Sequence, residues 1–317
     1  MSQPRLTAAR PEDAGEVLAL TRAAFTTLGT LDPPSGVFRE TVEQVAAELA
    51  AEGGVLAQEP TGDLVGVARL RREGPALWVR RVAVTPRWTG RGIGAQLLRA
   101  AEQVAADEGR TQLRLGVRTG LPENIAYWSR RGFRLDADHG FWVELVKPAP
   151  LRVPVGTAEA MRALGRRLAS VLRGGDLVVL TGGLGAGKTT FVQGLGQGLG
   201  VRGPVTSPTF VLARAHAPLG DGPGLVHVDA YRLGSRLEVD DLDLDADLDR
   251  TVVVVEWGAG LVEGLADSRL EVCIERFEGP GVADESDAGA RRVTVWPVGP
   301  RWGVDGLAGI VVGGDDR

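Results

Sequence analysis

A short run of residues in the second half of the chain has the types and spacing of a phosphate-binding loop. Residues 182–189 read GGLGAGKT, so Lys188 and Thr189 directly follow the glycine Gly187. Glycines let backbone N–H groups converge on phosphate oxygens, the lysine can reach the β- and γ-phosphates, and the threonine hydroxyl can ligate Mg²⁺. The run therefore predicts a site for a nucleoside triphosphate and its metal, and we call residues 182–189 the P-loop.

The elements around the P-loop are those that the motif needs. An apolar run at 177–180 precedes it and a helix-like run follows, so the helix would direct its positive end at the phosphates. Two further apolar runs end on an acid, LVHVD on Asp229 and TVVVVE on Glu256. Because ligands bind at the carboxyl ends of parallel strands, either acid could hold the metal or its water.

A second glycine loop lies in the first half of the chain. Residues 82–98 read VAVTPRWTGRGIGAQLL, which places a strand, then Gly90, Gly92 and Gly94, and then a helix. Glycines before a helix N-terminus suggest binding of a pyrophosphate. The loop lacks the Gly-Lys-Thr of a P-loop and the G-x-G-x-x-G of a dinucleotide site. We therefore expect two ligands in two domains.

The length of 317 residues is enough for two domains of roughly 100–200 residues. Strand-like and helix-like runs alternate in both halves, and the three prolines of PAPLRVP separate them. We predict an α/β chain with a first domain at 1–148, a linker at 149–154 and a second domain at 155–298. A polar, glycine-rich stretch at 278–291 is predicted to be a disordered insertion, and 299–317 to be a tail.

Helical spacing of apolar residues predicts one amphipathic helix in each domain. The apolar residues with this spacing are Leu97, Leu98, Ala101 and Ala105 in the first domain, and Met161, Leu164, Leu168 and Val171 in the second.

Composition narrows the classes of function. The net charge of −5 argues against a large nonspecific nucleic-acid surface. Cys273 is the lone cysteine, so no intramolecular disulfide can form, and with three histidines the chain has few ligands for a soft metal. The sequence has no apolar run of about 20 residues and no secretory signal pattern. We expect a cytoplasmic protein without membrane contact.

The second half resembles a known family. The stretches GGLGAGKTTFVQGL, VTSPTF, HVDAYRL and VVVVEW, in that order, are similar to the TsaE family of small ATPases in bacterial tRNA threonylcarbamoyladenosine synthesis. The resemblance covers about 155–276, with a strand at 293–296 as its end. It implies a P-loop NTPase-like domain with a mainly parallel sheet flanked by helices.

The resemblance also implies roles for single residues. Thr189 and Glu256 would ligate Mg²⁺, and Asp229 would assist hydrolysis and is a candidate further ligand. Lys188, Asp229 and Glu256 form the implied catalytic set. The implied ATP-binding residues are Gly183, Leu184, Gly185, Ala186, Gly187, Lys188, Thr189, Thr190 and Trp257.

A switch-like loop near the γ-phosphate is implied at Thr206, Ser207 and Thr209. The residue types support this expectation, because Pro208 biases Ser207 towards extended geometry. The hydroxyls could order around a γ-phosphate and relax after its loss.

The family also implies a partner, a TsaB–TsaD-like heterodimer that transfers threonylcarbamoyl to adenosine 37 of ANN-decoding tRNAs. ATP hydrolysis would reset this machine between cycles, and the chain would meet tRNA indirectly. The acidic stretch at 239–249 is interpreted as a solvated segment and not as a metal site.

The first half, over about 5–147, resembles the GNAT acetyltransferase family through the glycine loop and the stretch ENIAYWSRRGFR at 123–134. The resemblance implies a mixed sheet with helices that binds acetyl-CoA. The implied contacts are the strand residues Val82 and Val84 with pantetheine, the backbone of Arg91, Gly92, Ile93, Gly94 and Ala95 with the pyrophosphate, and Asn124 with the cofactor.

Two positions depart from the GNAT pattern. Thr89 stands where the loop usually begins with Arg or Gln. Trp128 stands where a tyrosine commonly protonates the leaving thiolate, and an indole cannot do this. Tyr127 is one position earlier, about 100° around a helix. We expect acetyl-CoA binding with slow transfer, because general acid catalysis contributes typically 10²–10⁴-fold.

The general base and the acceptor of the acetyl group stay open. His139 or Glu73 could be the base, and the acceptor could be a protein N-terminus, a ribosomal protein or a small amine.

Two other functions are alternatives for the same residues. In the first, ATP binding only sets docking, and the chain is an adaptor whose acetyl-CoA-binding domain is inactive, as the Trp128 position favours. In the second, the chain is a small-molecule kinase, which would need an arginine-bearing lid. Only Arg269 and Arg276 lie between Glu256 and the predicted insertion.

Overall fold

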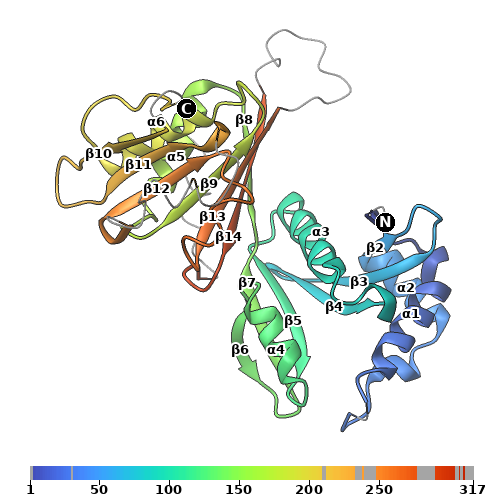
Figure 1. The fold of residues 1–317 in the computed structure, drawn as a ribbon. Helices are drawn as coiled ribbons and strands as arrows, with labels where there is room; N and C mark the ends of the chain where they lie inside the picture. Colours follow the sequence, from blue (N-terminus) through green and yellow to red (C-terminus); the bar gives the residue numbers. More distant parts are fainter. Residues whose placement is uncertain are drawn as a thin grey trace. The chain divides into compact units, whose positions relative to one another are not determined.

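The chain folds into two compact units, Met1–Ala149 and Pro150–Arg317 (Figure 1). The computed structural model describes residues 3–29, 31–208, 212–232, 238, 248–276, 290–303, 307 and 310. Across these ranges, no helix is both long and apolar enough to span a membrane.

The first unit is built on a seven-stranded mixed sheet with the order β1-β2-β3-β4-β5-β7-β6. Its strands are β1 (Arg5–Ala8), β2 (Gly54–Gln58), β3 (Leu64–Glu73), β4 (Ala76–Val84), β5 (Gln112–Arg118), β6 (Arg134–Asp138) and β7 (Trp142–Pro148). Neighbouring strands are antiparallel except β4 and β5, which are parallel. The mixed sheet predicted for the first domain is therefore confirmed.

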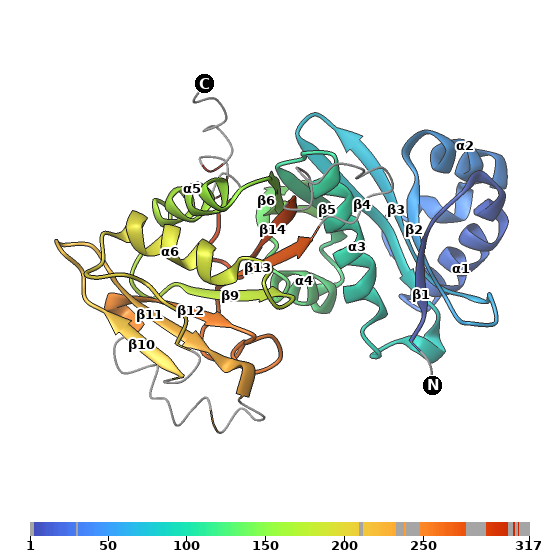
Figure 2. The ribbon, with the colours of Figure 1, turned by 90° about the horizontal axis from the view of Figure 1, so that it is seen from above.

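Helices cover both faces of this sheet (Figure 2). On one face, α1 (Ala14–Thr26) and α2 (Val42–Glu52) pack against the strand residues Leu56, Val67 and Ala83. On the other lie α3 (Ile93–Asp107) and α4 (Pro122–Ser129). The four apolar residues predicted for the stripe of α3 are all buried, because the 3.6-residue period brings them to one side.

The second unit is built on another seven-stranded sheet, with the order β10-β11-β12-β9-β13-β14-β8. Its strands are β8 (Leu151–Val155), β9 (Leu177–Gly182), β10 (Ala213–His216), β11 (Gly224–Asp229), β12 (Thr251–Glu256), β13 (Arg269–Arg276) and β14 (Arg291–Val298). The four central strands β11, β12, β9 and β13 are parallel, and the outer three pair antiparallel. Of the parallel strands, β9 and β12 read as near-continuous apolar runs, as is typical of strands covered on both faces.

The helices α5 (Ala158–Ala169) and α6 (Lys188–Leu199) lie side by side on one face of the second sheet. Glycines let them approach closely: a Cβ at Gly165 would lie 2.4 Å from the carbonyl oxygen of Phe191, and one at Gly194 would lie 2.1 Å from that of Arg162. Met161, Leu164 and Leu168 of the predicted stripe are buried. Val171 follows the end of α5 and is partly buried.

The structure corrects the predicted linker at 149–154. Residues 151–155 form β8, which pairs antiparallel with β14 at the edge of the sheet. Pro154 is tolerated there because an edge strand can leave one side of its backbone unpaired. Arg291, predicted to end a disordered insertion, begins β14, and residues 278–289 lie outside the described residues.

Part of the predicted tail joins the core. Trp302, Leu307 and Ile310 are buried with the α5, α6 and sheet residues of the second unit. Arg301 donates from both Nε and Nη2 to the carboxylate of Asp176, at 3.1 Å each.

Candidate functional sites

The P-loop turns from β9 into α6 through glycines in the left-handed region. Gly182, Gly185 and Gly187 have φ values of 151°, 70° and 109°, and Gly187 is the N-cap of α6. A side chain at Gly182 would also meet the carbonyl oxygen of Ile274 at 2.6 Å. The first N–H groups of a helix have no intrahelical acceptor, so this turn offers donors and the positive end of a dipole to an anion.

Lys188 is held at the mouth of this turn. Its side chain is 6% exposed, and its Nζ donates to the carbonyl oxygens of Gly182 at 3.0 Å and Gly183 at 3.2 Å. Nζ also lies 4.1 Å from the centre of the Trp257 ring. Burial lowers the pKa of Lys188, and the charges of Glu256 and Asp229 act in the opposite direction.

Three neighbouring strands end together at this site. β11, β12 and β9 are adjacent and parallel, and Asp229 and Glu256 are register partners. Glu256 in turn pairs with Leu180 of β9, just before the P-loop. The structure therefore brings the two predicted acids to the same edge of the sheet as the P-loop.

Glu256 makes contacts that join two of these elements. Its Oε1 accepts a hydrogen bond from the Thr189 hydroxyl at 3.1 Å and lies 3.0 Å from Nε2 of His227. Asp229 accepts from the backbone N–H of Tyr231 at 3.1 Å through Oδ1. A hydroxyl and carboxylates are hard oxygen ligands, and they suit Mg²⁺ bound together with phosphates.

Trp257, predicted to lie at the nucleotide site, directly follows Glu256. Its φ is 61°, in the left-handed region, and its N–H donates to the carbonyl oxygen of Leu180 at 3.0 Å. Tyr231 meets its ring edge-on, with the ring centres 5.5 Å apart. A left-handed tryptophan is uncommon and is held here by this backbone bond and by Lys188.

Most of the predicted switch-like loop is described, while Thr209 lies outside the described residues. The Thr206 hydroxyl accepts a hydrogen bond from Arg214 of β10 at 2.6 Å. The carbonyl oxygen of Leu212 accepts from the N–H of Asp229 at 2.8 Å. The segment that follows the loop is therefore tied to the end of β11, at the residue implied in hydrolysis.

Sequence reasoning missed three residues at this site. Arg276 donates from Nη2 to the carbonyl oxygens of Leu184 and Gly185 at 3.4 Å each, and Arg291 donates from Nε to that of Ala186 at 2.9 Å. The third is His227. Its one sequence signal is the alternation in LVHVD, which places it on the same face of the strand as Asp229.

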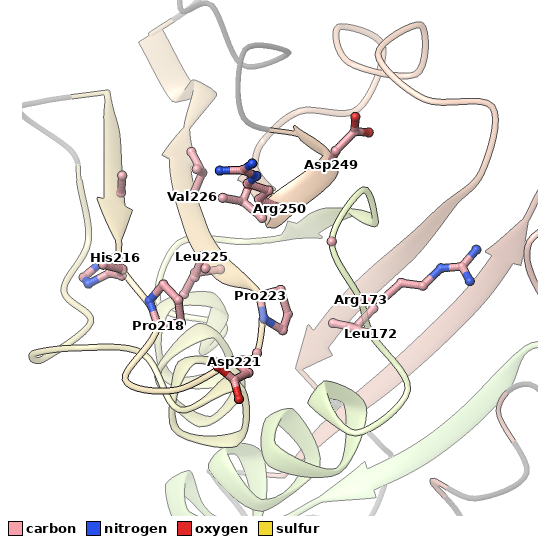
Figure 3. Close-up of a pocket in the computed structure, with 16 residues that line it drawn as sticks. Leu172, Arg173, His216, Pro218, Asp221, Pro223, Leu225, Val226, Asp249 and Arg250 are labelled. Carbon is pink, nitrogen blue, oxygen red and sulfur yellow. The ribbon is translucent and has the colours of Figure 1, made fainter.

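A cavity of about 710 Å³ lies at the other end of the same strands (Figure 3). Gly224–Val226 line it at the start of β11, and so do Asp249, Arg250 and Thr251 beside the start of β12. None of the predicted site residues lines it. It is therefore separate from the P-loop, which lies at the carboxyl ends of the strands.

In the first unit, the parallel strands β4 and β5 pair only at their beginnings. Residues 76–78 pair with 112–114, and β4 and β5 then continue to Val84 and Arg118 without pairing with each other. Arg81, with a φ of 50°, lies at an irregularity in the pairing of β3 and β4. Val82 and Val84 therefore lie on the part of β4 that β5 does not pair with, although Val84 pairs with Gly66 of β3 on the other edge. This part of β4 leads into the glycine loop.

The glycine loop resembles the P-loop in its backbone. Gly90 and Gly92 have φ values of 79° and 81°, and Gly92 is the N-cap of α3. The first N–H groups of a helix lack an intrahelical acceptor, and those of Ile93 and Gly94 stand at this start of α3. The N–H of Ala95 already donates to the carbonyl oxygen of Gly92 at 3.0 Å. The structure brings the predicted pyrophosphate residues and the end of β4 together.

Helix α4 places Tyr127 and Trp128 in different surroundings, and Asn124 lies in its first turns. Trp128 is buried in the core beside Phe133, with the ring centres 5.7 Å apart. A Cβ built on Gly94 would lie 2.6 Å from the hydroxyl oxygen of Tyr127. The hydroxyl therefore reaches the first turn of α3, although helical spacing rotates Tyr127 away from the position of the family's tyrosine. Burial raises the pKa of Tyr127, against a smaller opposite effect of Arg131.

The two candidate bases of the first unit, Glu73 and His139, lie in different places. Glu73 pairs with Ala76 at the beginning of β4, the opposite end from the glycine loop, and forms an ion pair with Arg71 at 3.1 Å. The structure therefore does not bring Glu73 to the loop. His139 stacks on Trp142 with ring centres 4.0 Å apart, and its Nε2 lies 3.6 Å from Oε2 of Glu144.

Comparisons with known proteins agree with this division. Residues 155–280 match the family described as threonylcarbamoyl adenosine biosynthesis protein TsaE, and residues 22–133 match the acetyltransferase (GNAT) family. The tRNA threonylcarbamoyladenosine biosynthesis protein TsaE of Streptomyces coelicolor is 62% identical over 143 residues, which are 45% of this chain and 93% of that protein. Its counterpart in Bacillus subtilis is 38% identical over 120 residues, 37% of this chain and 73% of that protein.

Solved structures similar to each half are also found. Bacillus subtilis YdiB is 31% identical, with a TM-score of 0.37, and the match covers 48% of this chain and 88% of that one. The PaiA N-acetyltransferase of Thermoplasma acidophilum, in complex with coenzyme A, is 19% identical, with a TM-score of 0.42, covering 47% of this chain and 99% of that one. The chain belongs to the TsaE family through its second unit, to which the first unit joins a GNAT acetyltransferase domain.

Proposed function

We propose that the second unit binds and hydrolyses ATP with Mg²⁺ in support of threonylcarbamoylation of adenosine 37 in ANN-decoding tRNAs. One observation carries the proposal: the P-loop, Glu256 and Asp229 end three adjacent parallel strands at one edge of the sheet. The names of the similar TsaE proteins supply the pathway.

The residues at this edge have different roles in binding and hydrolysing the nucleotide. The backbone of the P-loop cradles the phosphates, and Lys188 adds positive charge where charge develops on the leaving group. Thr189 and Glu256 would hold Mg²⁺, and the ion would neutralise negative charge on the phosphates. Asp229, 7% exposed and one strand away, orients the attacking water.

We further propose that this ATPase acts on a TsaB–TsaD-like heterodimer and meets tRNA through it. The switch-like loop supplies a physical route, because Leu212, three residues after Thr209, accepts a hydrogen bond from the backbone N–H of Asp229. Loss of the γ-phosphate would release the hydroxyls of Thr206 and Ser207 and so change the surface offered to the partner.

For the first unit we propose binding of acetyl-CoA and transfer of its acetyl group to an amine. The turn at Gly92 would hold the pyrophosphate, and Asn124 would contact the cofactor. The edge of β4 that β5 leaves unpaired, at Val82 and Val84, would pair with pantetheine. The amine nitrogen would attack the thioester carbonyl and lose a proton, the C–S bond would break, and the leaving thiolate would take up a proton. Trp128 cannot supply that proton, so we expect slow turnover.

Steady-state release of phosphate tests the ATPase, with the partner heterodimer present. The wild-type chain should release phosphate and the Glu256→Ala chain should not. An inert wild type in the presence of the partner refutes the proposal.

Calorimetry with acetyl-CoA tests the first unit. A Gly92→Glu substitution places a carboxylate in the turn proposed for the pyrophosphate and should abolish binding. Equal affinity of both chains for acetyl-CoA would count against the site.

A further inference from the structure

His227 is a buried polar residue that the proposed reaction does not yet use. It lies in the middle of β11 and is 0% exposed. Its Nε2 lies 3.0 Å from Oε1 of Glu256, while its Nδ1 is buried and has no hydrogen-bond partner among the described residues. A buried polar group without a partner is costly, so its presence calls for a reason.

The contacts determine which nitrogen of His227 carries the proton. A carboxylate oxygen only accepts hydrogen bonds, so Nε2 must be the donor to Glu256. Nδ1 of the neutral ring is then a buried lone pair that no described residue meets with a donor. The other neutral tautomer would set the Nε2 lone pair against Oε1 and also bury an unpaired N–H.

Glu256 is held through one oxygen by two donors. Oε1 accepts from the Thr189 hydroxyl at 3.1 Å as well as from His227. Oε2 accepts no hydrogen bond from the residues that the structure describes. The carboxylate is therefore fixed by Oε1 and keeps Oε2 available for a metal or its water.

The register of the strands produces this arrangement. Asp229 pairs with Glu256, and His227 pairs with Val254, two residues before it. Side chains two residues apart share a face, so His227 contacts Glu256 on the diagonal. His227 on β11 and Thr189 on α6 thus both donate to the carboxylate of Glu256 on β12.

We propose that His227 is a positioning residue, which orients the Glu256 carboxylate for Mg²⁺ by donating from Nε2. The inference rests on the proposed ATP site. His227 itself is not a ligand, because its Nε2 is engaged with Glu256 and its Nδ1 is enclosed. Partners that orient a ligand typically contribute 10–100-fold to metal affinity or activity.

Calorimetry of ADP binding tests the role without requiring hydrolysis. For each chain, the ratio of ADP affinity in Mg²⁺ to that in EDTA gives the metal-dependent gain. His227→Met should reduce this gain about 10–100-fold relative to wild type. His227→Gln should restore much of it, because Gln has nearly the same length as Met and carries an N–H donor. ADP affinity in EDTA should be similar in all three chains.

A second histidine provides a matched control. His216 lies in β10 and is also buried, but its Nδ1 is near the carbonyl oxygen of Arg202 at 3.5 Å and not near Glu256. His216→Met should therefore keep the full gain. This variant separates the loss of a buried imidazole from the loss of the hydrogen bond to Glu256.

The outcomes distinguish the two levels of the proposal. Equal gains in wild type, His227→Met and His227→Gln overturn the positioning role and leave the ATP site standing. Equal losses of the metal-dependent gain in His227→Met and His227→Gln also overturn the positioning role. The loss of imidazole packing would then be enough to explain the effect. A wild-type chain that binds no ADP in Mg²⁺ overturns the ATP site itself.

Discussion

Asp229 and Glu256 are register partners on the parallel strands β11 and β12, at the edge where the P-loop leaves β9. Both side chains are buried. Their contacts differ, because Glu256 accepts from Thr189 next to Lys188, whereas Asp229 accepts from the backbone of Tyr231. Two carboxylates in one site can therefore serve different functions, one on the metal and one on the water.

Substitutions that remove one charge at a time should separate these functions. Asp229→Asn should lower the rate of phosphate release about 10²–10⁴-fold and leave the Mg²⁺-dependent gain in ADP affinity unchanged. Glu256→Gln should lower both, because its amide is a poorer metal ligand. Phosphate release and calorimetry on the same preparations measure the two effects.

The opposite result would exchange the roles of Asp229 and Glu256 in binding the metal and orienting the water. If Asp229→Asn lost the Mg²⁺-dependent gain and Glu256→Gln kept it, then Asp229 would be the acid that holds the metal. The sequence left this alternative open.

The crossing of α5 and α6 should tolerate no side chain at Gly194. A Cβ there would lie 2.1 Å from the carbonyl oxygen of Arg162, which is backbone and cannot turn aside. We expect Gly194→Ala to lower the free energy of unfolding by about 3 kcal/mol or more, beyond the usual 1–3 kcal/mol of overpacking. Urea unfolding of the full chain, monitored through hydrogen exchange in α5 and α6, measures this change in the free energy of unfolding.

Gly156 supplies the control for that substitution. A Cβ at this position meets nothing within 4 Å, so Gly156→Ala should change the unfolding free energy by less than about 0.5 kcal/mol. An equally stable Gly194→Ala chain would show that the helices can move apart.

Much of the second unit could be predicted from the sequence because its pattern is local. The strands ending at Asp229 and Glu256 are unbroken apolar runs, and the P-loop carries its function in its own spacing. The edge strand β8 could not be predicted, because prolines such as Pro154 are typical of a linker. Only its pairing with β14 shows that the segment is a strand.

Other parts of the site depend on contacts between distant residues. Arg276 and Arg291 pair across β13 and β14 and both donate to carbonyl oxygens of the P-loop. No local pattern marks an arginine for such a contact. His227 likewise gains its role from the register between β11 and β12, which no spacing within LVHVD determines.

The first unit should lose stability in acid through Glu40. Burial would raise the pKa of this carboxyl, but hydrogen bonds and charges from Arg69 and Arg81 outweigh it, so the pKa lies below its ordinary value of 4.5. A lowered pKa means that the stabilisation is fully present above the unfolded-state pKa and is lost as the pH falls through the folded-state pKa. Glu40→Gln should therefore be less stable than wild type at pH 7 and should approach it in acid.

Hydrogen exchange in β3 and β4, measured from pH 7 down to about pH 3, follows this effect. The gap in protection between wild type and Glu40→Gln should narrow as the pH falls below about 4.5. A gap that stays constant over this range would mean that the contacts of Glu40 do not depend on its charge.

Tyr127 should affect the affinity for acetyl-CoA more than its turnover. Its hydroxyl lies at Gly94, in the turn proposed to bind the pyrophosphate, whereas the thioester would lie at the far end of pantetheine along β4. Tyr127→Phe should weaken acetyl-CoA binding about 2–10-fold through loss of one hydrogen bond and leave the rate constant for thiol release within about twofold. Calorimetry and a thiol assay measure the two quantities separately. A fall of 10²-fold or more in thiol release at unchanged affinity would instead make the Tyr127 hydroxyl the acid that Trp128 cannot be.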